Sequence, residues 1–181
     1  MKVVFLDRDG VINKYPGDKE YVTSLAKFKF LPRAKKAIRL LHQNKIKLFV
    51  ASNQAGVGKG TYSQSTLNKI TEYMLQKIRE AGGDLDGVYY CTHRKEVNCP
   101  CRKPKPGLVD IIKKKNKISL RCACFVGDTI RDVKTAKAAG CKSILVFSGK
   151  EKPSESRNWE SKPDFVFKDL FEAAKFILGK K

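Results

Sequence analysis

The chain has 181 residues, of which 41% are hydrophobic and 9% aromatic, and its formal net charge is +20 at pH 7. This composition excludes an intrinsically disordered protein, and the length predicts a single folded domain over residues 1–181. No apolar stretch is long enough for a secretory signal or a membrane span, so we expect a cytoplasmic protein without a membrane partner, whose six cysteines stay reduced.

The strong positive charge attracts anions, which include phosphates and nucleic acids. The basic residues are nevertheless spread along the chain, and no basic motif interleaved with aromatic residues accompanies them. We therefore interpret the charge as a solvated, lysine-rich surface, and we expect neither a nucleic-acid partner nor an oligomer.

Short apolar runs alternate with helical patterns along the whole chain. In chain order, the patterns predict a strand at 3–6, a helix at 32–44, a strand at 46–51, a helix through 67–78, a strand at 88–90, a helix through 108–112, a strand at 122–126, a helix at 132–139, strands at 143–147 and 165–167, and a helix at 170–178. Strands and helices that alternate in this way form a parallel sheet with right-handed crossovers. We therefore predict a three-layer α/β domain without an insertion large enough for a second domain.

The first strand is an unbroken apolar run, Val3 to Leu6, and Asp7-Arg8-Asp9-Gly10 follows it directly. Ligand crevices in parallel sheets lie beyond the carboxyl ends of the strands. Two acids one residue apart repel each other unless a cation or a positive side chain lies between them. The motif alone is also compatible with a polar turn, so its interpretation depends on the other strand ends.

Three other segments place polar residues at the same edge of the predicted sheet. Ser52 and Asn53 follow the second strand, Arg102 and Lys103 precede a helix, and Asp128 follows the fourth strand, with Asp132 one helical turn later. Carboxylates from two strands form an oxygen-rich site that suits Mg²⁺. A serine hydroxyl, loop amides and a lysine hold phosphate groups, and an aspartate can attack phosphorus to form an aspartyl-phosphate.

This set of motifs resembles the haloacid dehalogenase-like (HAD-like) superfamily of phosphohydrolases, whose four motifs match Asp7-Arg8-Asp9-Gly10, Ser52, Lys103 and the segment 127–132 in the family's order. The resemblance implies that Asp7 is the nucleophile and a Mg²⁺ ligand. Asp9 is then the acid and base, with its backbone carbonyl on the metal. Ser52 and Lys103 hold the phosphoryl oxygens, and Asp128 is the second Mg²⁺ carboxylate. Asp132 either supports the metal site or orients Lys103.

A cluster of cysteine and histidine residues lies between the third strand and the following helix. Its members, Cys91, His93, Cys99 and Cys101, form two pairs that a five-residue loop separates. This pattern fits a closed, tetrahedral, structural Zn²⁺ site, although a loop with scattered thiols is the alternative. The remaining cysteines, Cys122, Cys124 and Cys141, are expected to be core residues.

The cysteine pattern, which continues as Cys101-Arg102-Lys103-Pro104, is similar to two capless families within the superfamily. These are the D-glycero-D-manno-heptose 1,7-bisphosphate 7-phosphatases and the histidinol-phosphate phosphatases. The segment from Asn53 to Gly60 resembles the heptose enzymes' Asn-Gln-Ser-Gly-Ile-Ala-Arg-Gly more closely, with Ala55 in place of serine and Lys59 in place of arginine. The short loop between the two Cys/His pairs resembles the histidinol type. The resemblance implies a Rossmann-like, HAD-like sheet with a zinc-binding loop and no large cap domain.

The first hypothesis for function is a Mg²⁺-dependent phosphatase that acts on a sugar phosphate, namely a heptose bisphosphate. Histidinol-phosphate phosphatase is the second, and a polynucleotide 3′-phosphatase or a basic zinc module that binds nucleic acid is the third. The acids and the lysine of the four motifs argue against a vestigial site. The predicted substrate contacts are Arg8, Tyr21, Asn53, Gln54, Ala55, Arg102 and Thr129.

Overall fold

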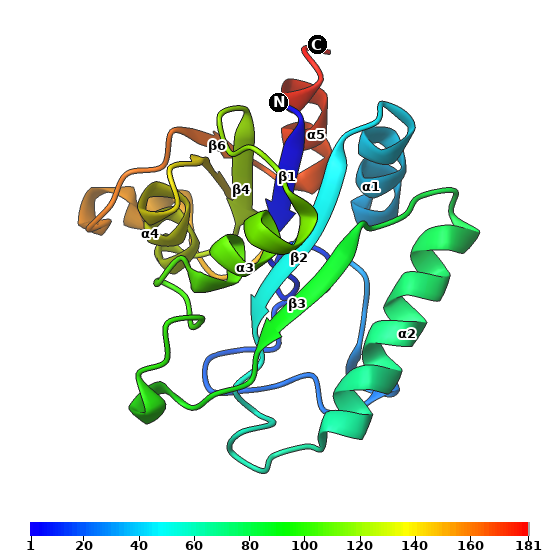
Figure 1. Ribbon diagram of the computed structural model, residues 1–181, viewed down its shortest axis with the longest axis vertical. Helices are drawn as coiled ribbons and strands as arrows, with labels where there is room; N and C mark the ends of the chain where they lie inside the picture. Colours follow the sequence, from blue (N-terminus) through cyan, green and yellow to red (C-terminus); the bar gives the residue numbers. More distant parts are fainter. Residues whose placement is uncertain (181) are drawn as a thin grey trace.

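The computed structural model describes residues 1–180 and has a six-stranded parallel sheet with the strand order β3-β2-β1-β4-β5-β6 (Figure 1). The strands are β1 (Val3–Leu6), β2 (Lys47–Asn53), β3 (Gly87–Cys91), β4 (Ala123–Gly127), β5 (Lys142–Val146) and β6 (Phe165–Phe167). The helices are α1 (Ala34–Gln43), α2 (Gln64–Glu80), α3 (Gly107–Asn116), α4 (Ile130–Ala138) and α5 (Leu170–Ile177). Short 3₁₀ helices are η1 (Leu25–Lys27), η2 (Lys95–Val97) and η3 (Pro153–Asn158). The predicted three-layer α/β architecture is confirmed.

The helices cover both faces of the sheet (Figure 1). Apolar residues of α1, α2 and α5 form one buried cluster with one face of the strands, whereas α3 and α4 contribute to a second cluster on the opposite face. Successive side chains of a strand point to opposite faces, and β1 therefore serves both clusters. Val4 and Leu6 belong to the first, while Val3 and Phe5 belong to the second. All four are buried, as the apolar run predicts for a central parallel strand.

The strand order reverses on either side of β1, because the chain proceeds from β1 to β2 and β3 on one side and to β4, β5 and β6 on the other. Ligands of such sheets bind beyond the carboxyl ends of the strands at this switch point. In Figure 1 these ends lie toward the bottom, where the long loops gather, whereas the N-terminus and helix α5 lie toward the opposite end. The segment between β1 and α1 contains η1 but no inserted domain, so the fold has no large cap.

The cysteines outside the Cys/His cluster differ in their burial. Cys124 and Cys141 are buried, as predicted, but Cys122 is exposed, and its assignment to the core is wrong. The reason is that β4 begins at Ala123, so Cys122 lies before the strand and outside its alternating pattern. Across residues 1–180, no helix combines the length and the apolar character needed to cross a membrane.

Candidate active site

Four segments converge on a cavity of about 270 Å³ at the carboxyl edge of the sheet. Asp7 and Asp9 follow β1, Ser52 lies near the end of β2, Lys103 lies in the loop before α3, and Asp128 follows β4. Parallel pairing of β1 with both β2 and β4 brings these ends together. The cavity is lined by Asp7, Asp9, Tyr15, Pro16, Gly17, Asp18, Lys19, Glu20, Tyr21, Ser52, Asn53, Ala55, Lys59, Arg102, Lys103, Asp128, Thr129, Arg131, Asp132 and Lys150.

The carboxylate of Asp7 lies between a backbone amide and a buried lysine. The amide of Arg8 donates to Asp7 Oδ1 at 2.8 Å, and Lys103 Nζ lies 3.0 Å from Asp7 Oδ2. Burial raises the pKa of Asp7, and the Lys103 charge and a hydrogen bond from Ser52 offset part of this effect. The carboxylate is therefore held in one orientation, but the nearby positive charge does not fully compensate for its burial.

Lys103 is buried and bridges two carboxylates. Its ammonium lies 2.6 Å from Asp132 Oδ1, while the hydroxyl and amide of Thr129 donate to Asp132 Oδ2 at 2.6 and 3.1 Å. Both oxygens of Asp132 are thus engaged, which favours its expected role in orienting Lys103 over support of a metal. The main chain of Lys103 is also held, because the Asn53 side chain accepts from its amide and donates to its carbonyl, both at 3.1 Å.

Asp9 is surrounded by hydrogen-bond donors. Oδ1 accepts from Arg8 Nη2 at 2.9 Å and from Asn13 Nδ2 at 2.8 Å, while Oδ2 accepts from Gln54 Nε2 at 2.9 Å. The side chains of Arg8 and Gln54 are 0% and 1% exposed, and neither lines the cavity. Their prediction as direct substrate contacts is therefore wrong for the side chains. The motif could not reveal that these two residues lie behind Asp9.

Asp128 completes a cluster of buried acids. Carboxylate oxygens of Asp7, Asp128 and Asp132 lie within 4.8 Å of one another. Burial raises the pKa of Asp128 well above its usual range, and repulsion from Asp132 and Asp7 adds to the effect. A buried set of oxygen ligands with excess negative charge suits a hard divalent cation such as Mg²⁺. The residues present therefore fit the expected metal, with Asp7 and Asp128 as its side-chain ligands.

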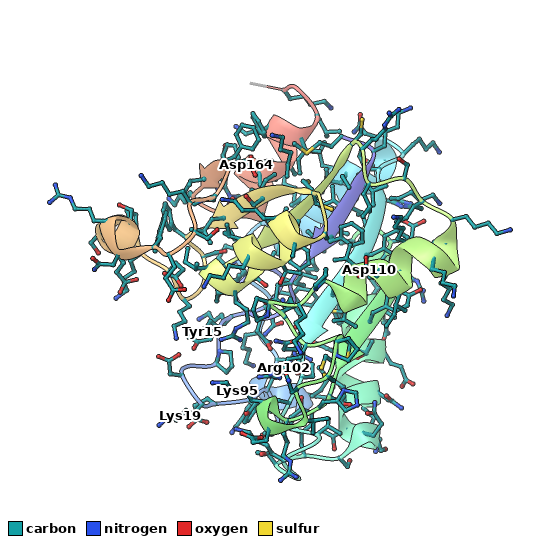
Figure 2. The ribbon with its side chains drawn as sticks, turned by 60° about the vertical axis from the view of Figure 1, so that its left-hand side comes forward. Tyr15, Lys19, Lys95, Arg102, Asp110 and Asp164 are labelled. Atoms are coloured by element: carbon teal, nitrogen blue, oxygen red, sulfur yellow. The ribbon has the colours of Figure 1, made fainter. Side chains whose placement is uncertain are left out.

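The rim of the cavity contains the other predicted substrate contacts, namely Tyr21, Asn53, Ala55, Arg102 and Thr129. It also contains residues that the sequence analysis missed, among them Tyr15, Arg131 and Lys150. Asp18 links the two sides, since Oδ1 accepts from both the Tyr15 hydroxyl and Lys150 Nζ at 2.5 Å. Figure 2 shows Tyr15 and Lys19 on one loop and Arg102 on another, at the same end of the molecule. For Lys150, the sequence did contain a signal, because Ser148-Gly149-Lys150 follows β5 and must lie at the same edge of the sheet as the other strand ends.

The Cys/His cluster has the geometry of a metal site. Ligand atoms of Cys91, His93, Cys99 and Cys101 lie within 4.8 Å of one another. Three neighbouring pairs, Cys91–Cys99, Cys99–Cys101 and Cys101–His93, are separated by 3.5, 3.4 and 3.4 Å. Sulfur ligands about 2.3 Å from a tetrahedral zinc are about 3.8 Å apart, so the cluster fits Zn²⁺ with little adjustment. No disulfide links these free cysteines.

The cysteine loop is attached directly to the rim of the cavity. Arg102 Nη1 donates to the carbonyl of His93 at 3.2 Å, and the Gly58 amide donates to the carbonyl of Thr92 at 3.1 Å. A methyl group added at Gly58 would overlap that same carbonyl. A metal in the cluster would therefore fix both Arg102 and the loop that begins at Ala55.

The sequence is similar to those of known HAD-like phosphatases. Residues 100–173 match the HAD-hydrolase-like family model. D-glycero-β-D-manno-heptose-1,7-bisphosphate 7-phosphatase of Neisseria meningitidis is 33% identical over 180 residues, which cover 98% of this chain and 95% of the relative. The enzyme of the same name from Pseudomonas putida is 35% identical over 179 residues, 98% of this chain and 100% of the relative.

The fold agrees as well. The crystal structure of D,D-heptose 1,7-bisphosphate phosphatase from B. bronchiseptica, complexed with magnesium and phosphate, superposes with a TM-score of 0.92 at 33% identity and covers 99% of both chains. The chain therefore belongs to the D-glycero-β-D-manno-heptose-1,7-bisphosphate 7-phosphatase family of HAD-like hydrolases.

Proposed function

We propose that this protein removes the 7-phosphate of D-glycero-D-manno-heptose 1,7-bisphosphate. The observation that carries the proposal is the convergence of Asp7, Lys103 and Asp128 on one cavity, with Lys103 Nζ 3.0 Å from Asp7 Oδ2. A carboxylate nucleophile, a buried cation and a second metal-binding acid are the groups that phosphoryl transfer through an aspartyl-phosphate requires. The family membership supports the same substrate.

Asp7, Asp128 and the backbone carbonyl of Asp9 would hold Mg²⁺. When bound, the ion supplies positive charge that stabilises the oxygens of the phosphoryl group during transfer. Lys103 and the Ser52 hydroxyl would contact the same oxygens from the protein side. Asp132 keeps the Lys103 ammonium directed at the cavity through the 2.6 Å contact.

In the first step, a carboxylate oxygen of Asp7 attacks phosphorus and the bond from phosphorus to the sugar oxygen breaks. Asp9 gives its proton to that oxygen, and the product leaves as an alcohol. In the second step, Asp9 takes a proton from water, the water oxygen attacks phosphorus, and the aspartyl-phosphate bond breaks to release inorganic phosphate. Asp7 and Asp9 thereby return to their starting states, so the cycle balances.

Arg102 is proposed to hold the second phosphate of the substrate. It lines the cavity, and its contact with the carbonyl of His93 orients the guanidinium. Lys59 lies 5.8 Å from the centre of the Tyr21 ring at the same rim, so the outer part of the cavity is basic and partly aromatic. A planar guanidinium binds a phosphate through two hydrogen bonds, whereas the amine of histidinol phosphate would be repelled here.

The test compares kcat/KM for heptose 1,7-bisphosphate and histidinol phosphate. We expect the wild type to prefer the bisphosphate, and Arg102→Ala to lose that preference while it retains most activity toward a small phosphate ester. Arg94→Ala removes an exposed arginine of the cysteine loop and is the matched control. Higher wild-type efficiency on histidinol phosphate would overturn the assignment.

We further propose that the Cys/His cluster holds one structural Zn²⁺. Four ligands leave no open coordination position, so the ion would order the loop that carries Arg102 and Lys103 rather than take part in the reaction. The chain is proposed to work as a single cytoplasmic domain and as a monomer. Light scattering on the purified protein would test the last point.

A further inference from the structure

A chain of hydrogen bonds leads from Tyr62, outside the cavity, to the acid Asp9. The Tyr62 hydroxyl donates to Gln54 Oε1 at 2.7 Å. Gln54 Nε2 in turn donates to Asp9 Oδ2 at 2.9 Å and to Ser52 Oγ at 3.3 Å. Tyr62 is 7% exposed and does not line the cavity, so it does not touch the substrate.

The hydroxyl of Tyr62 stabilises the observed orientation of the Gln54 amide by donating to its carbonyl. In its ionised form, which takes a proton from water in the second step, the Asp9 carboxylate only accepts hydrogen bonds, so the NH₂ group of Gln54 faces it. Its carbonyl then faces Tyr62, which has to donate. Burial raises the pKa of Tyr62 to about 12, so the hydroxyl keeps the proton that this bond needs. A reversed amide would place its carbonyl against the ionised Asp9 carboxylate, where two acceptors would face each other without a hydrogen between them.

The ring of Tyr62 is fixed in turn by the main chain of the neighbouring loop. Gly56 lies against the ring, and a methyl group added there would overlap Tyr62 Cε1. The Tyr21 ring, which lines the cavity, has its centre 6.3 Å from the centre of the Tyr62 ring. The hydroxyl therefore has little freedom to move away from Gln54.

We infer that Tyr62 is a positioning residue that acts through Gln54 to hold the Asp9 carboxyl group in place for proton transfer to the leaving oxygen. The inference rests on the acid role proposed for Asp9. Arg8 and Asn13 hold Oδ1 of Asp9, while Oδ2 accepts from Gln54 at 2.9 Å and more distantly from Arg8 Nη2 at 3.2 Å. Without the tyrosine hydroxyl, the Gln54 contact loses its fixed orientation while those of Arg8 and Asn13 remain.

The chemistry of the leaving group distinguishes this role from a structural one. When the phosphoryl group is transferred to Asp7, the oxygen of an alkyl leaving group needs the proton of Asp9. The p-nitrophenolate ion is stable without a proton, so it leaves without help from Asp9. The value of kcat/KM reports the steps up to this bond cleavage. A misplaced Asp9 therefore lowers kcat/KM for an alkyl phosphate and spares p-nitrophenyl phosphate.

The experiment measures kcat/KM of the Mg²⁺-loaded wild type, Tyr62→Phe and Gln54→Met on heptose 1,7-bisphosphate, glycerol 3-phosphate and p-nitrophenyl phosphate. We expect Tyr62→Phe to lose about 10-fold on the alkyl substrates and less than about 2-fold on the aryl one, a part of the 10²- to 10⁴-fold that a general acid contributes. Tyr89→Phe is the matched control, since it removes a hydroxyl that accepts from Asn116 Nδ2 at 3.2 Å elsewhere in the fold.

A double variant tests whether Tyr62 acts through Gln54. The two substitutions together should cost no more than Gln54→Met alone, because both break the same chain of contacts. Additive losses, equal losses on all three substrates, or no loss with Tyr62→Phe would each overturn the inference. A wild type that cleaves glycerol 3-phosphate but not the heptose bisphosphate would refute the proposed substrate and leave this comparison intact.

Discussion

Lys103 Nζ lies 2.6 Å from Asp132 Oδ1, and both side chains are 2% exposed. Burial alone would lower the pKa of Lys103, but Asp132 and Asp7 outweigh it and raise the pKa above its usual value. The lysine therefore stays charged in a nearly dry site. Its charge is shared between an acid that anchors it and the acid expected to attack phosphorus.

Asp132→Asn should lower kcat/KM by about 10²- to 10³-fold, because Lys103 would lose its anchor and pair with Asp7 instead of the phosphoryl oxygens. The variant should also lose about 3 kcal/mol of unfolding free energy, the lower end for a broken buried ion pair, since Lys103 keeps Asp7 as a partner. Kinetics and urea unfolding measure the two effects. Asp110→Asn, on the exposed side of α3, is the control. Full activity in Asp132→Asn would show that Lys103 does not need this anchor.

Asp7→Asn should remove nearly all turnover and leave the fold intact, since asparagine keeps the size of the side chain but is not a nucleophile. Burial raises the pKa of Asp7, so its charged form destabilises the metal-free protein at pH 7. We therefore expect an unchanged or higher Tm at pH 7. Any gain should shrink as the pH falls and should vanish below about pH 4, where the acid becomes protonated in both the folded and the unfolded states. Turnover above a few per cent of wild type would contradict the mechanism.

Magnesium affinity should rise with pH. The pKa values of Asp7 and Asp128 are both raised by burial, so protons compete with the ion for these carboxylates. Binding then releases protons, and the apparent Kd falls by up to about tenfold per pH unit for each proton released, below the raised pKa. Calorimetry in two buffers of different ionisation enthalpy measures the release. A Kd that stays constant as the pH falls from 8 toward the ordinary carboxylate pKa of about 4 would argue against these residues as the ligands.

Cys99→Ser should lose the zinc and lower the Tm, and it should weaken bisphosphate hydrolysis through Arg102, which is bonded to the carbonyl of His93. Cys122→Ser is the matched control, since Cys122 is exposed and lies outside the cluster. Elemental analysis, thermal unfolding and kcat/KM are compared for the two variants. An absence of zinc in wild-type protein purified without chelator would refute the assignment.

The strand ends could be predicted because the chemistry there is local. An apolar run such as Val3 to Leu6 predicts a central strand, and the acid that follows must lie at the carboxyl edge. The Cys/His cluster is equally local, because its four ligands lie within an eleven-residue segment, from Cys91 to Cys101. These features depend on short-range order and on the parallel topology, which the alternation of strands and helices already implies.

Residues whose roles depend on long-range packing could not be predicted. Arg8 and Gln54 belong to motifs that border the cavity, yet their side chains point behind Asp9. Tyr62 has no motif, and its link to Gln54 depends on how the loop from Ala55 folds back. Lys150 reaches the cavity because β5 is parallel to β4, which makes its amide a donor to Asp128 Oδ2 at 2.8 Å. The spacing of residues in the sequence does not predict any of these contacts.

The glycines around Asp128 have a consequence for ion selectivity. Gly10 and Gly149 lie so close to this carboxylate that a methyl group at either position would overlap Asp128 Oδ2. Main chain therefore packs against this carboxylate at two positions, which would leave it little room to move away from a bound ion. Calcium needs bonds of about 2.3–2.6 Å and flexible ligands, whereas magnesium takes bonds of about 2.0–2.1 Å. We therefore expect the site to prefer magnesium to calcium.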